Sequence, residues 1–393
     1  MAKPIGAICN LDCTYCYYLH KEKGYAPADD YRMNESVLRE YIRQSIDHQP
    51  GPEIHFSWQG GEPTLLGVDY FENIVKLQRQ YIQPGKVVVN DIQTNGTLLD
   101  EKWCEFFRIN SFLVGISIDG PPDLHDYYRK SKSGAPTSAR VVAGIRHLQK
   151  YQVEFNTLTV LNRMNAKEPM RVYEYLTGEL GSNFLQFIPC VEPVGFDDPS
   201  EMWKADRPDI PVTDWTVLPE DYGDFLITIF DHWVRNDVGR VFVRIFDTML
   251  GLWMGMPSSS CNFGAICGKA LALEHDGSVY CCDHYVYPEY KLGNLRKTGL
   301  GTMVMSKQQM DFAFNKEDSL PQYCKDCEVK FACNGDCPKN RILYTPDGEP
   351  GLNYLCAGNR KFMNYIDPYM KFMAKELQQG RNVLGVMDWA RRR

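Results

Sequence analysis

The cysteines near the start of the chain are spaced for metal chemistry. Cys9, Cys13 and Cys16 follow a C-x3-C-x2-C pattern, and the next cysteine is Cys104. Four thiolates would complete an iron–sulfur cluster or a structural zinc site, whereas three thiolates on one short loop leave one iron without a protein ligand. Such an iron can bind a small molecule, so the spacing predicts a catalytic centre.

A second group of cysteines lies in the C-terminal third of the chain. Of the 14 cysteines, nine fall between residues 261 and 356, among turns that contain glycine and proline. In a reducing compartment this clustering indicates metal or iron–sulfur ligation rather than disulfides. The isolated Cys104 and Cys190 fit small buried apolar side chains instead. Without Cys281, the group supplies eight ligands, enough for two four-cysteine clusters: Cys261, Cys267, Cys282, Cys324, Cys327, Cys333, Cys337 and Cys356.

Composition and charge exclude several classes of protein. At 393 residues the chain exceeds the size at which one hydrophobic core stops growing, so we expect a large domain plus a smaller one. The net charge of −7, with lysine and arginine scattered, argues against a nucleic-acid surface. The sequence has no apolar run of about 18 residues and no signal-peptide pattern, so we expect a cytoplasmic protein without membrane contact.

Strand and helix patterns alternate up to about residue 191, which is typical of βα units around a parallel sheet. Six such units predict an incomplete barrel. Only eight residues precede Cys9, so we expect a shortened first strand, with leading residues missing or Met1-Ala2 in place of native sequence. A helix is expected over Asn34–His48, with Asn34 as its N-cap. The expected strands are Ile5–Ile8, Ile54–Trp58, Val87–Ile92, Leu113–Ile118, Phe155–Leu161 and Phe184–Ile188.

Polar loops follow the first four predicted strands. In parallel α/β barrels the loops at the carboxyl ends of the strands form the active site, so we expect these loops to converge. In the second loop, Gly60 and Gly61 allow a ligand to approach the backbone closely because they lack a Cβ. The four are the cysteine loop, Gly60-Gly61-Glu62-Pro63, Thr94-Asn95-Gly96 and Asp119-Gly120-Pro121.

The C-terminal part predicts a separate cysteine-rich domain. Residues 192–218, rich in Pro, Asp and Trp, are typical of an insertion, and helical patterns over 219–260 form a connector. The segment 261–360 contains a hairpin around Gly277 and too little apolar material for a core, so inorganic clusters would serve as that core. A final helix, Phe362–Gln379, and a basic tail make up residues 361–393.

These motifs resemble those of a known superfamily. The C-x3-C-x2-C motif after one predicted strand and Gly-Gly-Glu-Pro after the next strand resemble the radical S-adenosylmethionine superfamily, and the cysteines from Cys267 to Cys356 resemble its SPASM extension. Within it, Ser57–Pro63, Gln93–Thr97 and Cys282-Asp283 are similar to anaerobic sulfatase-maturating enzymes. The resemblance covers nearly the whole chain and implies an α/β fold: a partial (β/α)6 TIM-type barrel over residues 1–218, followed by a C-terminal cysteine-rich SPASM domain.

The resemblance also implies the cofactors, which are S-adenosyl-L-methionine and three [4Fe–4S] clusters. In the superfamily, S-adenosylmethionine chelates the open iron, and its reductive cleavage yields a 5′-deoxyadenosyl radical that takes hydrogen from an unactivated carbon. Glu62 is expected near the amino group of this cofactor. The residues expected around it are Tyr15, Gly60, Gly61, Glu62, Ser117, Arg129 and Val191.

The implied reaction oxidises a Cys or Ser in a sulfatase polypeptide to Cα-formylglycine. Asp283 is the expected general base, because a carboxylate beside the ligand Cys282 could take the thiol or hydroxyl proton. Tyr18 and Gln59 are expected to hydrogen-bond to the substrate peptide. The implied partners are a sulfatase segment with a Cys-x-Pro-x-Arg type motif and an electron-donor protein such as flavodoxin or ferredoxin.

Spacing does not decide how the later cysteines divide between two clusters. Local spacing would keep Cys337 with the three cysteines before it, as in a compact ferredoxin-like or zinc site. We favour the family pattern, because it ties both halves of the segment together, and we favour Cys282 over Cys281 because it fits Gly277-x4-Cys. The family pattern gives one cluster to Cys261, Cys267, Cys282 and Cys337, and the other to Cys324, Cys327, Cys333 and Cys356.

Two rival interpretations stay open. Another SPASM peptide modifier would share the clusters but form a thioether or carbon–carbon crosslink, or epimerise a residue; Asp283 together with Gln59 favours the maturase. A non-catalytic iron–sulfur electron carrier or zinc-stabilised module would close its clusters with four ligands. It would not need an open iron beside a Gly-Gly-Glu-Pro loop.

Overall fold

The computed structural model describes residues 1–24, 31–196 and 211–393. The chain forms two compact units. The first comprises Met1–Ile118, His125–Asn156 and Lys269–Phe312, and the second comprises Asp119–Leu124, Thr157–Gly268 and Ala313–Arg393. The two units are defined by contacts between residues, whereas the domain boundaries expected from the sequence are defined by motifs. The expected boundaries therefore stay a prediction.

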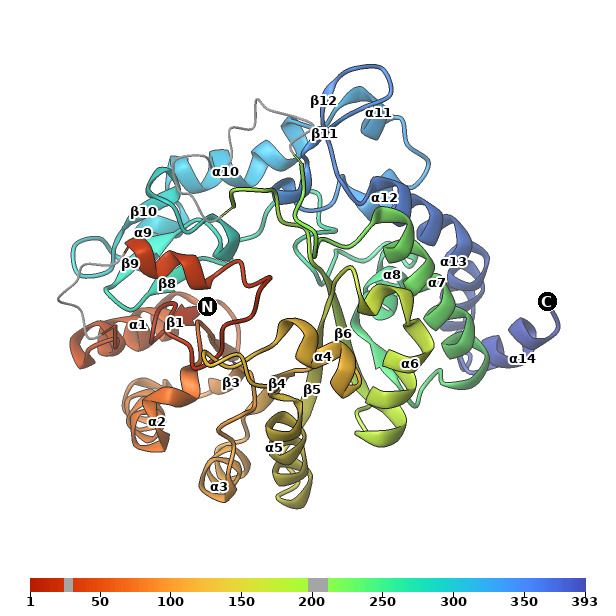
Figure 1. The fold of residues 1–393 in the computed structure, drawn as a ribbon. Helices are drawn as coiled ribbons and strands as arrows, with labels where there is room; N and C mark the ends of the chain where they lie inside the picture. Colours follow the sequence, from red (N-terminus) through yellow and green to blue (C-terminus); the bar gives the residue numbers. More distant parts are fainter. Residues whose placement is uncertain (25–30, 197–210) are drawn as a thin grey trace. The chain divides into compact units, whose positions relative to one another are not determined.

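The first unit is built on a parallel sheet (Figure 1). Its strands are β1 (Ala2–Lys3), β2 (Glu53–Trp58), β3 (Val87–Thr94) and β4 (Leu113–Ser117), which pair in this order. On the other side of β1 lies β8 (Ala272–Glu274), followed by the antiparallel β9 (Ser278–Tyr280) and β10 (Lys291–Asn294). The predicted α/β class and the hairpin around Gly277 are therefore confirmed.

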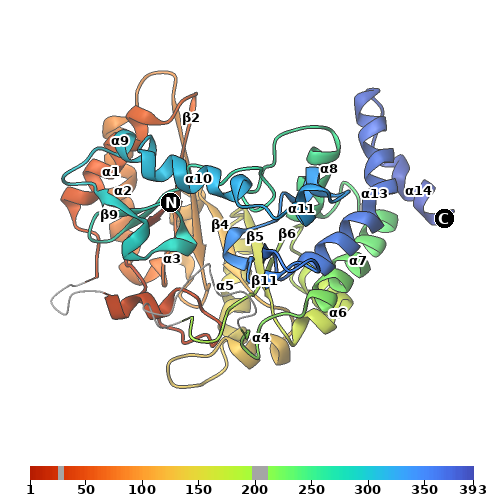
Figure 2. The ribbon, with the colours of Figure 1, turned by 90° about the horizontal axis from the view of Figure 1, so that it is seen from above.

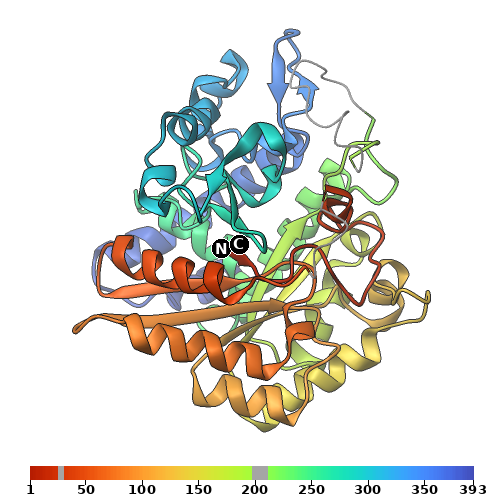
Figure 3. The same ribbon diagram turned by 90° about the vertical axis from the view of Figure 1, so that its left-hand side faces the viewer.

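Helices pack against this sheet because its strands bury alternate apolar side chains. Ile54, Phe56 and Trp58 of β2 are fully buried. The Phe56 ring lies 5.6 Å from that of Tyr41 on the first of these helices, measured between ring centroids. Neighbouring helices lie side by side along the sheet (Figure 3): α1 (Glu35–His48), α2 (Val68–Tyr81), α3 (Glu101–Ile109) and α5 (Ser138–Lys150).

The N-cap of α1 is the predicted one. The Asn34 side chain accepts a hydrogen bond of 3.1 Å from the backbone N–H of Val37. This bond satisfies one of the free donors in the first helical turn and explains why the helix begins there.

One predicted strand is wrong. Residues Ile5–Ile8 are not extended; the first strand is Ala2–Lys3, and a turn follows it. Gly6 has a φ of 57°, and its N–H donates to the carbonyl of Lys3 at 3.0 Å. Pro4 cannot donate to a ladder, so the apolar run after it turns toward the cysteine loop instead of extending the sheet.

The second unit contains a shorter parallel sheet of β5 (Phe155–Leu161), which begins at the boundary of the unit, β6 (Phe184–Pro189) and β7 (Phe242–Val243). The helix α13 (Cys356–Gln378) packs along α7 (Pro219–Asn236) (Figure 2). This approach is close, because a Cβ on Gly358 would lie 2.1 Å from the carbonyl oxygen of Pro219. The predicted final helix is confirmed, but it begins six residues earlier, at Cys356.

The predicted insertion at 192–218 lies partly outside the described residues. Its two described ends pair with each other: Pro193 and Val212 form an antiparallel bridge, and the Thr213 N–H donates to the Glu192 carbonyl at 2.9 Å. The insertion therefore leaves and returns at one place in the second unit.

Shorter elements complete both units. No helix among the described ranges is long and apolar enough to cross a bilayer. The further helices are α4 (Pro122–Tyr128), α6 (Pro169–Glu174), α8 (Arg244–Trp253), α9 (Leu300–Val304), α10 (Lys307–Asp318), α11 (Gln322–Lys325), α12 (Lys330–Cys333) and α14 (Gly385–Arg391), and the two-stranded sheet is β11 (Leu343–Tyr344) with β12 (Pro350–Leu352).

Candidate active site

The loop that carries Cys9, Cys13 and Cys16 follows β1, and all three thiols are half-buried and outside disulfides. Another segment of the first unit holds this loop. The Asp12 N–H donates to the Lys130 carbonyl at 2.8 Å, and the Thr14 N–H donates to the Tyr128 carbonyl at 3.1 Å. The backbone of the loop is therefore fixed while its thiols stay accessible.

Gly60 and Gly61 lie directly against the cysteine loop. The Gly61 N–H donates to the Gly6 carbonyl at 2.7 Å, and the Glu62 N–H donates to the Ile8 carbonyl at 2.8 Å. A Cβ on Gly61 would lie 2.0 Å from the Ile8 carbonyl oxygen, far inside van der Waals contact. In this structure the glycines let two loops of the protein approach each other. The sequence predicted only that they would let a ligand approach the backbone.

Glu62 is fully buried, and its carboxylate joins two of the predicted loops. One oxygen accepts from the N–H and hydroxyl of Thr64, at 3.0 and 2.5 Å, and from the hydroxyl of Thr94 at 2.8 Å. The other oxygen accepts from the Asn95 N–H at 2.7 Å. Burial raises the pKa of this carboxyl, although the four hydrogen bonds oppose that shift.

Asn95 extends this network to the first cysteine. Its side-chain amide donates to Asn10 Oδ1 at 2.8 Å and to the Cys9 sulfur at 3.7 Å. Burial, together with the nearby Glu62 charge, raises the pKa of Cys9 to about 12. Iron binding would have to displace this proton, as metals do at thiol ligands. The sequence interpretation included Asn95 only as part of a polar loop.

Tyr15, Ser117 and Arg129 belong to the same unit as the three cysteines, whereas Val191 belongs to the other unit. Tyr15 and Arg129 are buried, and the Arg129 guanidinium lies 5.4 Å from the centroid of the Tyr15 ring. Ser117 is the last residue of β4. The structure therefore brings Tyr15 and Arg129 together beside the cysteine loop.

Asp283 lies in the first unit and is paired at both carboxylate oxygens. Oδ1 lies 2.6 Å from the ammonium of Lys3, and Oδ2 accepts a hydrogen bond of 2.6 Å from the Tyr17 hydroxyl. Burial alone would raise the pKa of Asp283, but Lys3, His284 and Tyr17 outweigh it and lower this pKa to about 2. The sequence interpretation missed both Lys3 and Tyr17; the adjacency of Tyr17 to Cys16 was its only available signal.

The two predicted substrate contacts lie next to this pair. The Lys3 ammonium donates to Gln59 Oε1 at 3.4 Å and lies 4.6 Å from the centroid of the Tyr18 ring. The Tyr18 hydroxyl donates to the buried Glu274 carboxylate. Because the hydroxyl proton is donated to Glu274, the phenol oxygen of Tyr18 can act toward a substrate N–H only as an acceptor.

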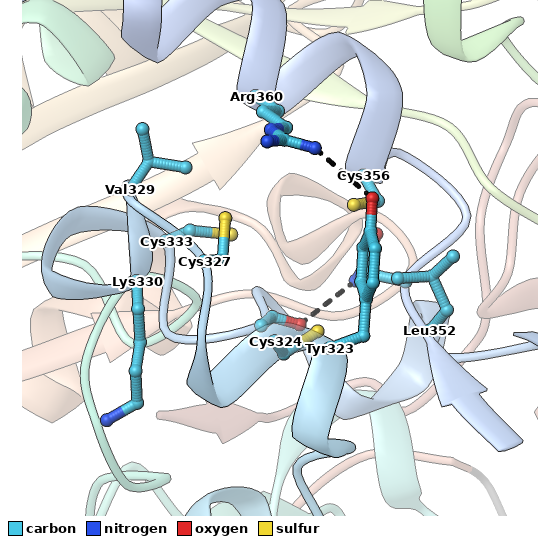
Figure 4. A pocket seen from close by; sticks show the side chains of 11 residues that line it. Tyr323, Cys324, Cys327, Val329, Lys330, Cys333, Leu352, Cys356 and Arg360 are labelled. Atoms are coloured by element: carbon cyan, nitrogen blue, oxygen red, sulfur yellow. Dashed lines mark hydrogen bonds between the residues drawn. The ribbon is translucent and has the colours of Figure 1, made fainter. Parts of the chain in front are cut away.

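A pocket in the second unit gathers four of the later cysteines (Figure 4). The four come from α11, α12, the turn between them and the start of α13. Cys337 is not among the residues that line the pocket. The other residues that line the pocket include the apolar Val329 and Leu352 and the charged Arg360. The four cysteines are Cys324, Cys327, Cys333 and Cys356.

Burial and neighbouring thiols raise the pKa of Cys356 to about 11, with Cys324 and Cys327 the largest contributors after burial. Across the described residues, no three such side chains lie close enough to hold a single metal ion. An iron–sulfur cluster spaces its thiolates more widely than a zinc ion does, because each binds a different iron. Four thiolates are the ligand number of a [4Fe–4S] cluster and also of a structural zinc site.

The remaining predicted ligands divide between the two units. Cys261, Cys267 and Cys337 belong to the second unit. Burial is the main cause that raises the pKa of Cys267 and that of Cys337, the latter to about 12, and the charge of Cys261 contributes to both shifts. Buried Lys316 donates to the Cys261 carbonyl at 2.8 Å. Cys282 belongs to the first unit.

Comparison with known proteins decides the family. Residues 4–176 match the radical SAM superfamily, and residues 265–328 match an iron–sulfur cluster-binding domain, SPASM. The serine-type anaerobic sulfatase-maturating enzyme of Bacteroides thetaiotaomicron is 44% identical over 389 residues, which are 98% of this chain and 94% of that protein. The chain belongs to the anaerobic sulfatase-maturating enzymes.

Other relatives in this family agree. The cysteine-type anaerobic sulfatase-maturating enzyme of Clostridium perfringens is 33% identical over 96% of this chain and 98% of its own length. A solved structure described as native anSMEcpe with bound AdoMet and Cp18Cys peptide superposes with a TM-score of 0.83, at 34% identity, over 96% of this chain and 98% of that one. The predicted family, fold class, enzyme class and cofactor classes of this sulfatase-maturating enzyme are confirmed.

Proposed function

We propose that this chain oxidises a cysteine or serine of a sulfatase polypeptide to Cα-formylglycine. The observation that carries the proposal is the group around Asp283, a buried carboxylate paired with Lys3 beside both predicted substrate contacts, Gln59 and Tyr18. The maturase interpretation requires a base next to a site for a peptide, and the contacts within this group support both roles. Relatives of the serine type and of the cysteine type support including both substrate residues.

The residues of the first unit fit S-adenosylmethionine and its cluster. Cys9, Cys13 and Cys16 would hold three irons, since they are three half-buried thiols on one fixed loop. When bound, the cluster and S-adenosylmethionine supply radical chemistry that removes a hydrogen atom from an unactivated carbon. The residues of this unit that we propose for binding S-adenosylmethionine are Tyr15, Gly60, Gly61, Glu62, Ser117 and Arg129. The family resemblance adds Val191, which belongs to the second unit.

A direct contact with the cofactor is only part of the role that we propose for Glu62. Its oxygens already accept four protein hydrogen bonds, so its first task is to hold Thr94 and Asn95 in place. Asn95 in turn orients Cys9. Any contact of Glu62 with an amino group would use a remaining lone pair.

Asp283 accepts the proton of the substrate. As hydrogen leaves the substrate Cβ, the thiol or hydroxyl proton moves to Asp283, and one electron leaves the substrate. A cysteine then becomes a thioaldehyde that water converts to the aldehyde, and a serine becomes the aldehyde directly. The pKa of Asp283, lowered to about 2, means that the carboxylate is ionised at neutral pH, which is the state that a proton acceptor requires.

We propose two auxiliary [4Fe–4S] clusters as the route for that electron, three clusters in all. The pocket of Figure 4 supports one of them, with Cys324, Cys327, Cys333 and Cys356 as ligands. Exclusion of Cys337 from this pocket supports the family pattern over local spacing. The other cluster would be held by Cys261, Cys267, Cys282 and Cys337.

The sulfatase segment would carry a Cys-x-Pro-x-Arg type motif, and an electron-donor protein such as flavodoxin or ferredoxin would reduce the chain. We also propose a cytoplasmic location, since cysteines clustered at the spacings of metal or iron–sulfur ligands are typical of a reducing compartment. The proposed domains are a radical SAM barrel over 1–218, a connector over 219–260, a SPASM domain over 261–360 and a C-terminal part over 361–393.

The deciding experiment uses the anaerobically reconstituted chain with S-adenosylmethionine, a reductant and synthetic sulfatase peptides carrying Cys or Ser at the target position. We expect 5′-deoxyadenosine and a peptide aldehyde that reacts with a hydrazine probe. With the Cys peptide, sulfur is lost and a carbonyl is gained. A product that keeps its sulfur in a crosslink, having lost two hydrogens, would favour the rival SPASM crosslinking function. Failure to form any 5′-deoxyadenosine would favour an electron carrier.

A further inference from the structure

Lys3 is a buried cation at the centre of the proposed substrate site. Its side chain is 2% exposed. Its ammonium lies 2.6 Å from Asp283 Oδ1, 3.4 Å from Gln59 Oε1 and 4.6 Å from the centroid of the Tyr18 ring. One side chain therefore contacts the proposed base and both proposed peptide-binding residues.

The contacts of Lys3 differ in strength. The pairing with Asp283 is a charge-assisted contact of short length, the Tyr18 contact is a cation–π interaction, and the Gln59 contact is a long hydrogen bond. A buried ion pair adds little net stability, because desolvation of both charges offsets their attraction. Stability alone thus gives little reason for a lysine here, whereas the orientation of three functional side chains does.

Tyr17 completes the support of Asp283 from another direction. Its hydroxyl donates to Oδ2 at 2.6 Å, while its ring lies 4.9 Å from the His284 ring, between centroids. Lys3 comes from β1 and Tyr17 follows directly after Cys16. With both oxygens held, the carboxylate cannot rotate without breaking a charge-assisted contact.

We propose that Lys3 is a positioning residue of this enzyme, which holds Asp283 in the orientation needed to accept the substrate proton, with Tyr17 as the other support. The inference rests on the proposed function of Asp283 as base. Lys3 itself neither accepts nor donates the reacting proton. Its contacts with Gln59 and Tyr18 keep the peptide-binding residues at a constant distance from that carboxylate.

The test compares Lys3→Met with Lys3→Arg in the reconstituted enzyme. Lys3→Met keeps an apolar side chain of similar length and removes the cation. We expect kcat for peptide oxidation to fall by about 10²-fold or more, the loss typical of a disabled acid–base step, while the KM for peptide changes much less. Cleavage of S-adenosylmethionine should continue, so 5′-deoxyadenosine formed per aldehyde should rise. Lys3→Arg should restore part of kcat, because it keeps the charge.

A double-mutant cycle separates positioning from general structural damage. If Lys3 acts through Asp283, Lys3→Met should cause little further loss in an Asp283→Asn background. The matched control is Lys86→Met, which removes another lysine of the first unit, one whose ammonium donates to the Ile46 carbonyl at 2.7 Å. This control should leave the ratio of 5′-deoxyadenosine to aldehyde unchanged.

Tyr17→Phe provides a test that does not depend on Lys3→Met folding. It removes one hydroxyl, and we expect the same rise in uncoupled cleavage, in milder form. Tyr70→Phe is its control, since the buried Tyr70 hydroxyl donates to the Met33 carbonyl at 3.0 Å. Iron content and peptide affinity are measured for every variant.

The outcomes separate this inference from the proposed function. A wild-type enzyme that forms no aldehyde overturns the proposed function. A wild-type enzyme that does form aldehyde, with unchanged coupling in Lys3→Met and Tyr17→Phe, overturns the role of Lys3. Losses from Lys3→Met and Asp283→Asn that simply add would also overturn it, because independent sites add and coupled sites do not.

Discussion

The carbonyl oxygen of Ile8 lies 2.0 Å from the position that a Cβ on Gly61 would occupy. Gly61→Ala should therefore displace the cysteine loop. We expect the purified variant to lose about four iron atoms per chain, those of the cluster at Cys9, Cys13 and Cys16, and to lose cleavage of S-adenosylmethionine. Gly178→Ala is the control, because nothing lies within 4 Å of a Cβ there. Full iron content in Gly61→Ala would show that the loop can move aside.

Glu62→Gln tests the carboxylate that joins two loops. The glutamine amide would point an N–H group at one of the four groups that now donate hydrogen bonds to Glu62. We therefore expect the free energy of unfolding to fall by about 1–3 kcal/mol. The measurement is the anaerobic urea midpoint, with the exposed Glu105→Gln as control. An equal or higher midpoint would mean that burial already keeps Glu62 protonated, in line with its raised pKa.

Paired cysteine substitutions test the cluster assignment. Cys324→Ala with Cys356→Ala should remove one auxiliary cluster, whereas Cys337→Ala with Cys356→Ala should remove both. Iron analysis should show losses of about four and eight irons per chain, respectively. Cys104→Ala, a buried cysteine on α3, should lose none. A loss of about eight irons from both double variants would support assignment by local spacing, which places Cys356 in a different cluster from Cys324 and from Cys337.

Asp283→Asn should separate cofactor cleavage from peptide oxidation. The amide keeps the shape of the side chain but cannot accept the proton, so aldehyde formation should fall by about 10²–10⁴-fold. Iron content and some formation of 5′-deoxyadenosine should persist. The assay follows 5′-deoxyadenosine and peptide aldehyde in one reaction. An unchanged rate of aldehyde formation would place the base elsewhere.

Most of the secondary structure could be predicted from the sequence. Buried strands such as β2 and β5 are continuous apolar or alternating runs bounded by turns, which are local signals. The first strand was misplaced because Ile5–Ile8 is equally apolar but follows Pro4 and contains the turn residue Gly6. Its backbone carbonyls at Gly6 and Ile8 accept hydrogen bonds from Gly61 and Glu62, a tertiary contact that periodicity does not reveal.

The sequence by itself determined the chemistry of the first cysteine loop. Three thiols within eight residues are close in any compact conformation, so their spacing already predicts an iron with a vacant position. Only the tertiary structure decided that Cys356 joins the pocket of Cys324, that Glu62 ties Asn95 to the cysteine loop, and that Lys3 pairs with Asp283. These partners are far apart along the chain, and no local pattern encodes which distant side chains the packed strands and helices bring together.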